Sequence, residues 1–99
     1  MKCEVCNKET EVFVASSAYG PISFAYCKEC LINGLEPYGA IVDYIACAGS
    51  FPDDISEEYQ KDVRRQLKLQ GVSEEQFIKD FNEIKEILKD DEYIVSISL

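Results

Sequence analysis

The stretch AYCKECLING, residues 25–34, contains two cysteines, Cys27 and Cys30, in a CxxC spacing. A second such pair, Cys3 and Cys6 in the stretch CEVC, precedes it, with twenty residues between the pairs. One CxxC turn brings two sulfurs close enough to bind one ion, and two turns supply the four sulfurs of a tetrahedral site. The pattern therefore predicts a bound Zn²⁺ with these four cysteines as ligands. A site closed by four protein ligands is structural, because no position remains for a reactive water.

Three other uses of the cysteines agree less well with the sequence than zinc. A disulfide framework is disfavoured, because the chain has five cysteines and Met1–Glu4 shows no apolar signal region. A thioredoxin-like site normally has one CxxC in a βαβ context. Iron also accepts four thiolates, but neither pair is followed by the glycine expected of a rubredoxin-like turn. Zinc is therefore favoured, while iron and a redox dithiol stay open as alternatives.

The charge balance restricts the classes of partner. Nineteen acidic residues face ten basic ones, for a formal net charge of −9. Such a chain repels phosphate backbones, so direct nucleic-acid binding is disfavoured, and a basic protein partner or simple solubility is favoured. No 18-residue apolar run is present, so a membrane span is not expected, and we expect a cytoplasmic protein. The chain has no histidine, which removes the usual general base near neutral pH.

The two pairs flank a predicted β-hairpin. Residues 11–17 and 22–26 are strand-like, AYGP between them indicates a turn, and helix-compatible sequence follows Cys30. The order of knuckle, hairpin, knuckle and helix resembles a treble-clef or zinc-ribbon-like module. The motif MKCEVC…YCKEC is similar to the N-terminal zinc modules of the ClpX unfoldase and of the bacterial activator of protein arginine kinase. The resemblance covers residues 1–35 and implies a zinc-folded module that binds other proteins.

Helix signals dominate the remainder of the chain. Gly34 and Gly71 are suited to end helices, and Ser56 and Ser73 to begin them. The apolar stretch PYGAIVDYIACAG favours a buried helix, in which Cys47 is expected to be a small buried apolar residue. Two amphipathic segments follow, with apolar residues at helical spacing. Helices are therefore predicted over residues 37–48, 56–70 and 74–89.

The last residues, YIVSISL, alternate apolar and small polar side chains at Tyr93, Val95 and Ile97. This alternation predicts a strand over 93–98, paired with the hairpin in a three-stranded sheet or with the same strand of a second subunit in a homodimer. The predicted fold is thus a small zinc-stabilised α+β domain. It combines a Cys₄ module over 1–35 with a helical extension over 36–99, packed as one compact unit.

The absence of a catalytic constellation favours a non-catalytic function. No phosphate-binding glycine loop, activated nucleophile or paired carboxylate site is evident. We therefore expect an adaptor or regulator that docks on another protein, with Tyr19 in the hairpin turn, Tyr38 and Asp43 as candidate contacts. The first alternative is an acidic inhibitor, of phage or mobile-element type, that mimics nucleic acid or blocks a host enzyme. The second is a thiol–disulfide oxidoreductase.

Overall fold

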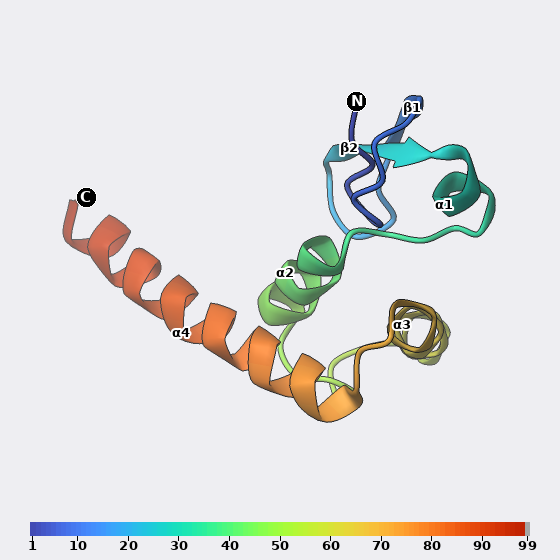
Figure 1. Ribbon diagram of the computed structural model, residues 1–99. Helices are drawn as coiled ribbons and strands as arrows, with labels where there is room; N and C mark the ends of the chain where they lie inside the picture. The colour runs from blue at the N-terminus through green and yellow to red at the C-terminus, as the bar shows by residue number, and fades with distance from the viewer. Residues whose placement is uncertain (99) are drawn as a thin grey trace. The chain divides into compact units, whose positions relative to one another are not determined.

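The computed structural model describes the backbone of residues 1–98 and the side chains of residues 1–88 (Figure 1). The chain divides into an N-terminal unit, Met1–Tyr44, and a C-terminal unit, Ile45–Leu99. This boundary lies later in the chain than the expected end of the cysteine module at residue 35. None of the helices in residues 1–98 is both long enough and apolar enough to cross a bilayer.

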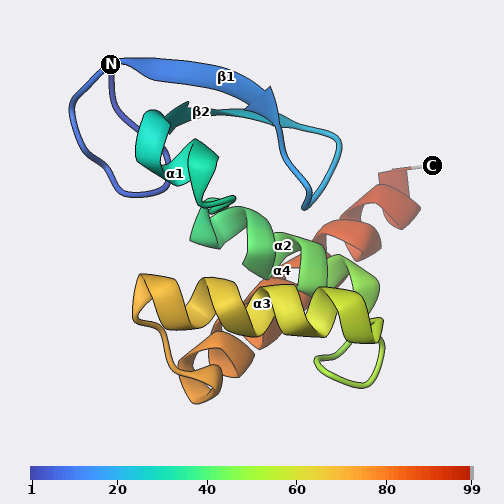
Figure 2. The same ribbon diagram turned by 90° about the vertical axis from the view of Figure 1, so that its right-hand side faces the viewer.

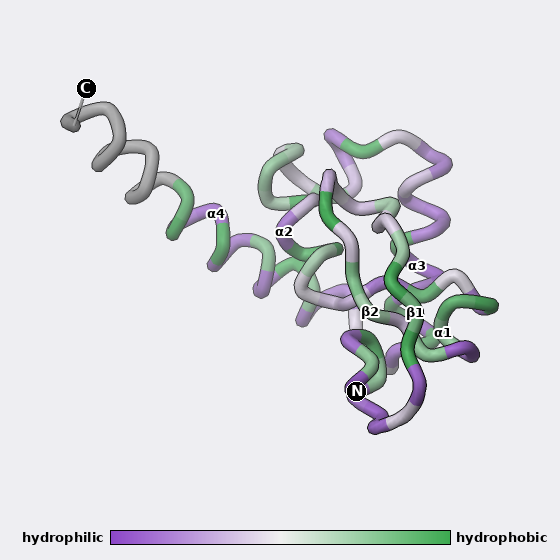
Figure 3. Tube along the Cα trace, turned by 90° about the horizontal axis from the view of Figure 1, so that it is seen from above, coloured by the Kyte–Doolittle hydropathy of each residue, from purple (hydrophilic) through white to green (hydrophobic). Residues whose placement is uncertain are grey.

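The N-terminal unit is built on an antiparallel hairpin of β1 (Val12–Ser16) and β2 (Ser23–Cys27), followed directly by α1 (Lys28–Ile32) (Figure 2). The register pairs Val12 with Cys27 and Ser16 with Ser23. Because side chains alternate along a strand, one face of β1 carries Val12 toward the cysteines. Much of β1 is apolar, as Figure 3 shows, yet Phe13 and Val14 are exposed. The predicted hairpin and the helix after it are confirmed.

Helix α1 ends where the sequence predicts. Gly34 has φ 64°, the left-handed conformation that glycine adopts without steric cost. Its N–H donates to the Leu31 carbonyl at 3.2 Å, and the Leu35 N–H donates to the Cys30 carbonyl at 2.9 Å. These two bonds form a Schellman cap. The cap turns Leu35 back against the cysteines of the same unit.

Helix α2 (Tyr38–Ala48) spans the boundary between the units. Its buried side chains follow the apolar pattern, with Ile41 and Ile45 fully buried. Asp43 lies on an exposed edge of the helix. Cys47 is also exposed, so the prediction of a buried Cys47 is wrong. The physical reason is helical periodicity, because Cys47 stands one turn after Asp43 on the same edge.

The C-terminal unit contains α3 (Glu57–Gln70) and α4 (Glu74–Ser98). The Ser56 hydroxyl accepts a hydrogen bond from the Tyr59 N–H, and Ser73 accepts one from the Gln76 N–H, so both predicted N-caps form. Gly71, at φ 71°, ends α3. The core is largely aromatic and aliphatic, and its buried members among the described side chains include Phe51, Ile55, Val63, Leu67, Phe77 and Phe81. Gln66 is a fully buried polar side chain of the same unit.

The predicted C-terminal strand does not form. Residues 93–98 are the last turns of α4, and within residues 1–98 the sheet has two strands. The sequence also holds a helical spacing here, because Val95 follows Leu88 by seven residues, which is about two helical turns. No glycine or proline after Ser73 interrupts the helix. The strand prediction is therefore wrong, and with it the three-stranded sheet.

The packing of Phe77 gives a test of the C-terminal core. Phe77 is fully buried, and its ring packs edge-on against Phe51 and Phe81 with centroids 5.5 and 5.4 Å away. We expect Phe77→Ala to lower the free energy of unfolding by about 3–5 kcal/mol, since it removes an aromatic ring from a packed core. The neighbouring Ile78, 37% exposed, is the control, and Ile78→Ala should cost less than about 1 kcal/mol. Urea unfolding followed by circular dichroism measures both, and equal losses would contradict this account.

Candidate metal centre

The N-terminal cysteine pair lies in a tight turn that backbone hydrogen bonds close. The Asn7 N–H donates to the Cys3 carbonyl and the Cys3 N–H donates to the Lys8 carbonyl, both at 3.0 Å. Asn7 has φ 64°, the conformation that a glycine occupies most easily, and asparagine is one of the few other residues that tolerate it. The missing glycine therefore does not distinguish this turn from a rubredoxin-like one. The argument from sequence against iron loses its force.

The second pair lies at the junction of β2 and α1. Cys27 ends β2, and Cys30 lies three residues later in α1, so their side chains share one face of the junction. The first turn is attached to β2 by two hydrogen bonds. The Glu4 N–H donates to the Ala25 carbonyl at 2.9 Å, and the Ala25 N–H donates to Glu4 Oε2 at 2.6 Å. This attachment brings the two pairs face to face.

All four sulfurs gather in one cluster, in agreement with the spacing of the two pairs. The Sγ atoms of Cys3, Cys6, Cys27 and Cys30 lie within 4.8 Å of one another, and none forms a disulfide. Cys6 Sγ and Cys27 Sγ are 3.8 Å apart. A tetrahedron with metal–sulfur bonds of about 2.3 Å has edges of about 3.8 Å. The donor set and its geometry therefore fit one thiolate-bound metal ion.

Burial differs among the four cysteines. Cys3, Cys27 and Cys30 are buried, packed with Val5, Val12 and Leu35, whereas Cys6 is exposed. With four sulfurs around one ion, no coordination position is left for a substrate or water. Such a centre would hold the turn, the hairpin and α1 together, and zinc or iron could fill it.

The thiols differ in acidity even without a metal. Burial raises the pKa of Cys3, but backbone hydrogen bonds from Cys6, Cys27 and Val5 outweigh it and lower the pKa to about 6. Burial raises the pKa of Cys30 far above its usual range, with further increases from hydrogen bonding to Cys27, Cys6 and Cys3 and from the charge of Cys3. Two thiolates about 4 Å apart repel each other by about 4 kcal/mol at an effective dielectric constant of 20. A cation is therefore needed before all four can ionise.

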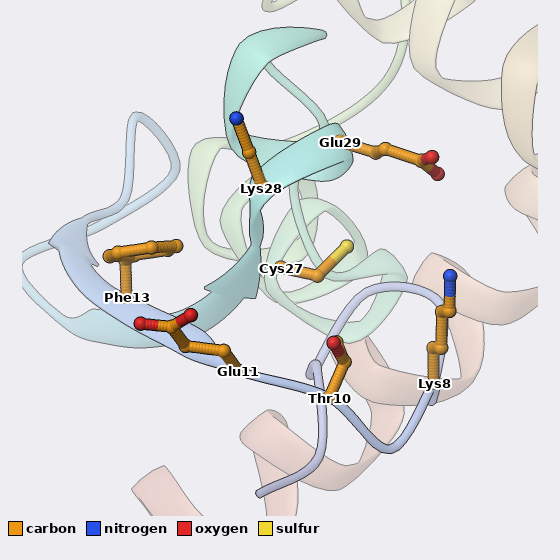
Figure 4. A pocket seen from close by; sticks show the side chains of 7 residues that line it. All are labelled: Lys8, Thr10, Glu11, Phe13, Cys27, Lys28 and Glu29. Carbon is orange, nitrogen blue, oxygen red and sulfur yellow. The ribbon is translucent and has the colours of Figure 1, made fainter.

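Basic side chains of the N-terminal unit stand near the cluster. Its three lysines, Lys2, Lys8 and Lys28, are all within two residues of a cysteine in sequence. Lys8 and Lys28 line a pocket of about 280 Å³ that also reaches Cys27 (Figure 4). Four thiolates around a divalent ion carry a net charge of about −2, which nearby ammonium groups can offset.

The candidate partner contacts are placed very differently. Tyr19 is 3% exposed, and its ring packs edge-on against Tyr44 with centroids 5.4 Å apart. The prediction of Tyr19 as a surface contact is therefore wrong, because the ring folds back onto the unit to bury its apolar area. Tyr38 is half-buried at the start of α2, and Asp43 is exposed. A role for Tyr38 or Asp43 in binding stays a prediction.

Sequence reasoning missed a buried polar cluster centred on Glu36. Its carboxylate accepts hydrogen bonds from Tyr26 Oη at 2.6 Å, Ser17 Oγ at 2.9 Å and the Ala18 N–H at 3.2 Å. Glu36 is only 8% exposed. Burial, and then the hydrogen bond and charge of Glu36, raise the pKa of Tyr26 well above its usual range. No local sequence motif predicts this cluster. Its hydrogen bonds attach the segment after α1 to the hairpin beside Cys27.

Comparison of the chain with known protein families, with curated proteins and with solved structures gives no match.

The acidity of the thiols predicts how metal affinity depends on pH. At neutral pH the metal must displace the proton of Cys30, whose pKa is raised, whereas Cys3 is already ionised above about pH 6. The metal-free protein thus binds more protons than the loaded one, so lower pH favours metal release. Zinc affinity should fall at least about tenfold per pH unit between pH 8 and pH 6, and more steeply below pH 6.

Competition with a chromophoric chelator across this pH range measures the effect. The Cys47→Ser variant is the control and should follow the same profile, because Cys47 lies outside the cluster. A zinc affinity independent of pH would contradict a thiolate centre.

Proposed function

We propose that this chain is a small, non-catalytic zinc-binding adaptor or regulator that acts by docking on another protein. The proposal is carried by one observation, the gathering of four sulfurs within 4.8 Å in a closed cluster. A closed Cys₄ site supplies folding free energy rather than reactivity. The same four residues are the basis of the resemblance to zinc-folded modules that bind other proteins.

The metal's part in this function would be to fold the docking surface. A two-stranded hairpin is marginal in water by itself, and the N-terminal turn and α1 flank β1–β2. Cys3, Cys6, Cys27 and Cys30 would hold the ion, and the ion would supply a structural cross-link between these segments. The reducing cytoplasm is the compartment in which such thiolates persist.

The surface composition supports a protein partner. The net charge is −9, which disfavours nucleic acid and membranes with anionic headgroups. Several large apolar side chains of the N-terminal unit are exposed, namely Met1, Phe13, Val14, Ile22, Leu31 and Ile32. Such side chains supply apolar contact area that a partner protein could bury.

A pair of cysteine variants tests the structural role of the metal. Cys27→Ser removes a buried ligand, while Cys47→Ser makes the same chemical change at an exposed cysteine outside the cluster. We expect the wild type and Cys47→Ser to retain one zinc per chain, and Cys27→Ser to lose the ion and the folded spectrum of the N-terminal unit. Structural zinc contributes on the order of 10 kcal/mol to such sites, so the loss should be complete.

Mass spectrometry under native conditions gives the metal content, and two-dimensional NMR reports on folding. A Cys27→Ser variant with a wild-type spectrum and melting temperature would overturn the structural role of the metal.

Docking itself is tested by affinity capture from nuclease-treated lysate at low and moderate salt with zinc-loaded protein. A stoichiometric partner that the metal-free variant does not retain is expected; recovery of the protein alone would contradict docking.

A further inference from the structure

The pocket beside the metal centre has two unlike sides. In Figure 4, Phe13 and Glu11 lie on one side of Cys27, and Lys8 and Glu29 lie on the other. Glu11 and Phe13 are two residues apart, where β1 begins, and side chains at that spacing share a face of an extended strand. Phe13 is 42% exposed. One side of the pocket therefore presents an aromatic ring and a carboxylate together.

The same pair of groups holds an arginine elsewhere in this chain. In the C-terminal unit, the Arg64 guanidinium lies 5.3 Å from the centre of the Phe51 ring, and its Nε donates to Glu74 Oε1 at 2.7 Å. The ring attracts the cation through its negative face, and the carboxylate accepts its N–H groups. Phe13 and Glu11 offer a comparable pair of partners at the pocket. Among the residues whose side chains are described, Glu11 forms no ion pair.

The charges around the pocket also favour a cation. Lys8 and Lys28 are balanced by Glu11 and Glu29, so these four side chains sum to zero. A divalent ion with four thiolates adds about −2 next to Cys27. The whole chain, at −9, adds long-range attraction for a basic partner. This negative field would repel a bound anion and would stabilise a cation over Phe13.

From these observations we infer that the pocket binds an arginine side chain presented by a partner protein, with the guanidinium over Phe13 and paired with Glu11. Arginine fits better than lysine, because its planar group can stack on a ring and bond to a carboxylate at the same time. The inference rests on the proposed docking function and names the chemistry of the partner. Lys28 stands opposite Glu11 when the strand register is continued past Val12 and Cys27. Lys28 forms no ion pair with Glu11 among the described side chains, so the Glu11 carboxylate is open to an incoming arginine.

The test is an NMR titration of the zinc-loaded protein with three short peptides. The sequence Gly-Ser-Xaa-Ser-Gly carries arginine, its neutral isostere citrulline, or glutamate at Xaa. The arginine peptide is expected to shift the amide resonances of residues 11–13 and 27–29, and the other two peptides are not. Raising the salt concentration should weaken the binding of the arginine peptide.

Two variants locate the site, and a third is the matched control. Glu11→Gln and Phe13→Leu should each raise the dissociation constant of the arginine peptide about twofold to fivefold, as expected for loss of an exposed charge or ring partner. Glu58→Gln makes the same change in net charge at an exposed position of α3. It should leave the dissociation constant unchanged.

Three outcomes would overturn the inference: equal binding of the citrulline peptide, tighter binding of the glutamate peptide, or equal weakening by Glu58→Gln. Zinc content and the folded spectrum are measured on the same samples. Folded, zinc-loaded protein without arginine binding would refute this inference and leave the proposed function standing. Arginine binding that persists in a folded, zinc-free protein would refute the structural role of zinc and support the pocket.

Discussion

The N-terminal unit depends on the meeting of four sulfurs that come from two distant turns. Twenty residues separate Cys6 from Cys27, yet all four Sγ atoms lie within 4.8 Å of one another. Around the cysteines the apolar side chains are only partly buried, namely Val5, Val12 and Leu35. Small domains with so little apolar area are commonly stabilised by a metal. The hairpin, α1 and the N-terminal turn each contribute to this one centre.

Local chemistry made the cysteine cluster and most helix boundaries predictable, although α4 runs to Ser98 and not to the expected residue 89. A CxxC spacing constrains two sulfurs within a single turn, and caps such as Gly34, Ser56 and Gly71 depend on backbone geometry within a few residues. The alternating C-terminal pattern was less informative, because Val95 also follows Leu88 by seven residues, which continues the apolar spacing of a helix. The missing signal was the lack of any helix-breaking residue after Ser73. The lack of glycine and proline after Ser73 favours a continuous helix over a strand in this segment.

Local sequence could not predict which side chains are buried by residues far away in the chain. Tyr19 lies in the hairpin turn, a position typical of an exposed contact, but its ring is buried against Tyr44. Asn7 adopts a conformation that sequence reasoning reserved for glycine. Glu36 precedes a proline in a connecting segment and looks like an ordinary surface acid. The partners of Tyr19 and Glu36 are ten or more residues away, so no window of local sequence contains both members of the interaction.

The Glu36 cluster also constrains how this protein can change over evolutionary time. Ser17 and Tyr26 come from the two arms of the hairpin region, and both hydroxyls depend on the one carboxylate. A mutation to phenylalanine at 26, or to alanine at 17, leaves Glu36 with fewer donors in a site that water scarcely reaches, which carries a penalty of about 1–3 kcal/mol. Replacement of all three by apolar residues of similar shape can be nearly neutral. Positions 17, 26 and 36 are thus expected to covary among homologous sequences, as a group inherited together or lost together.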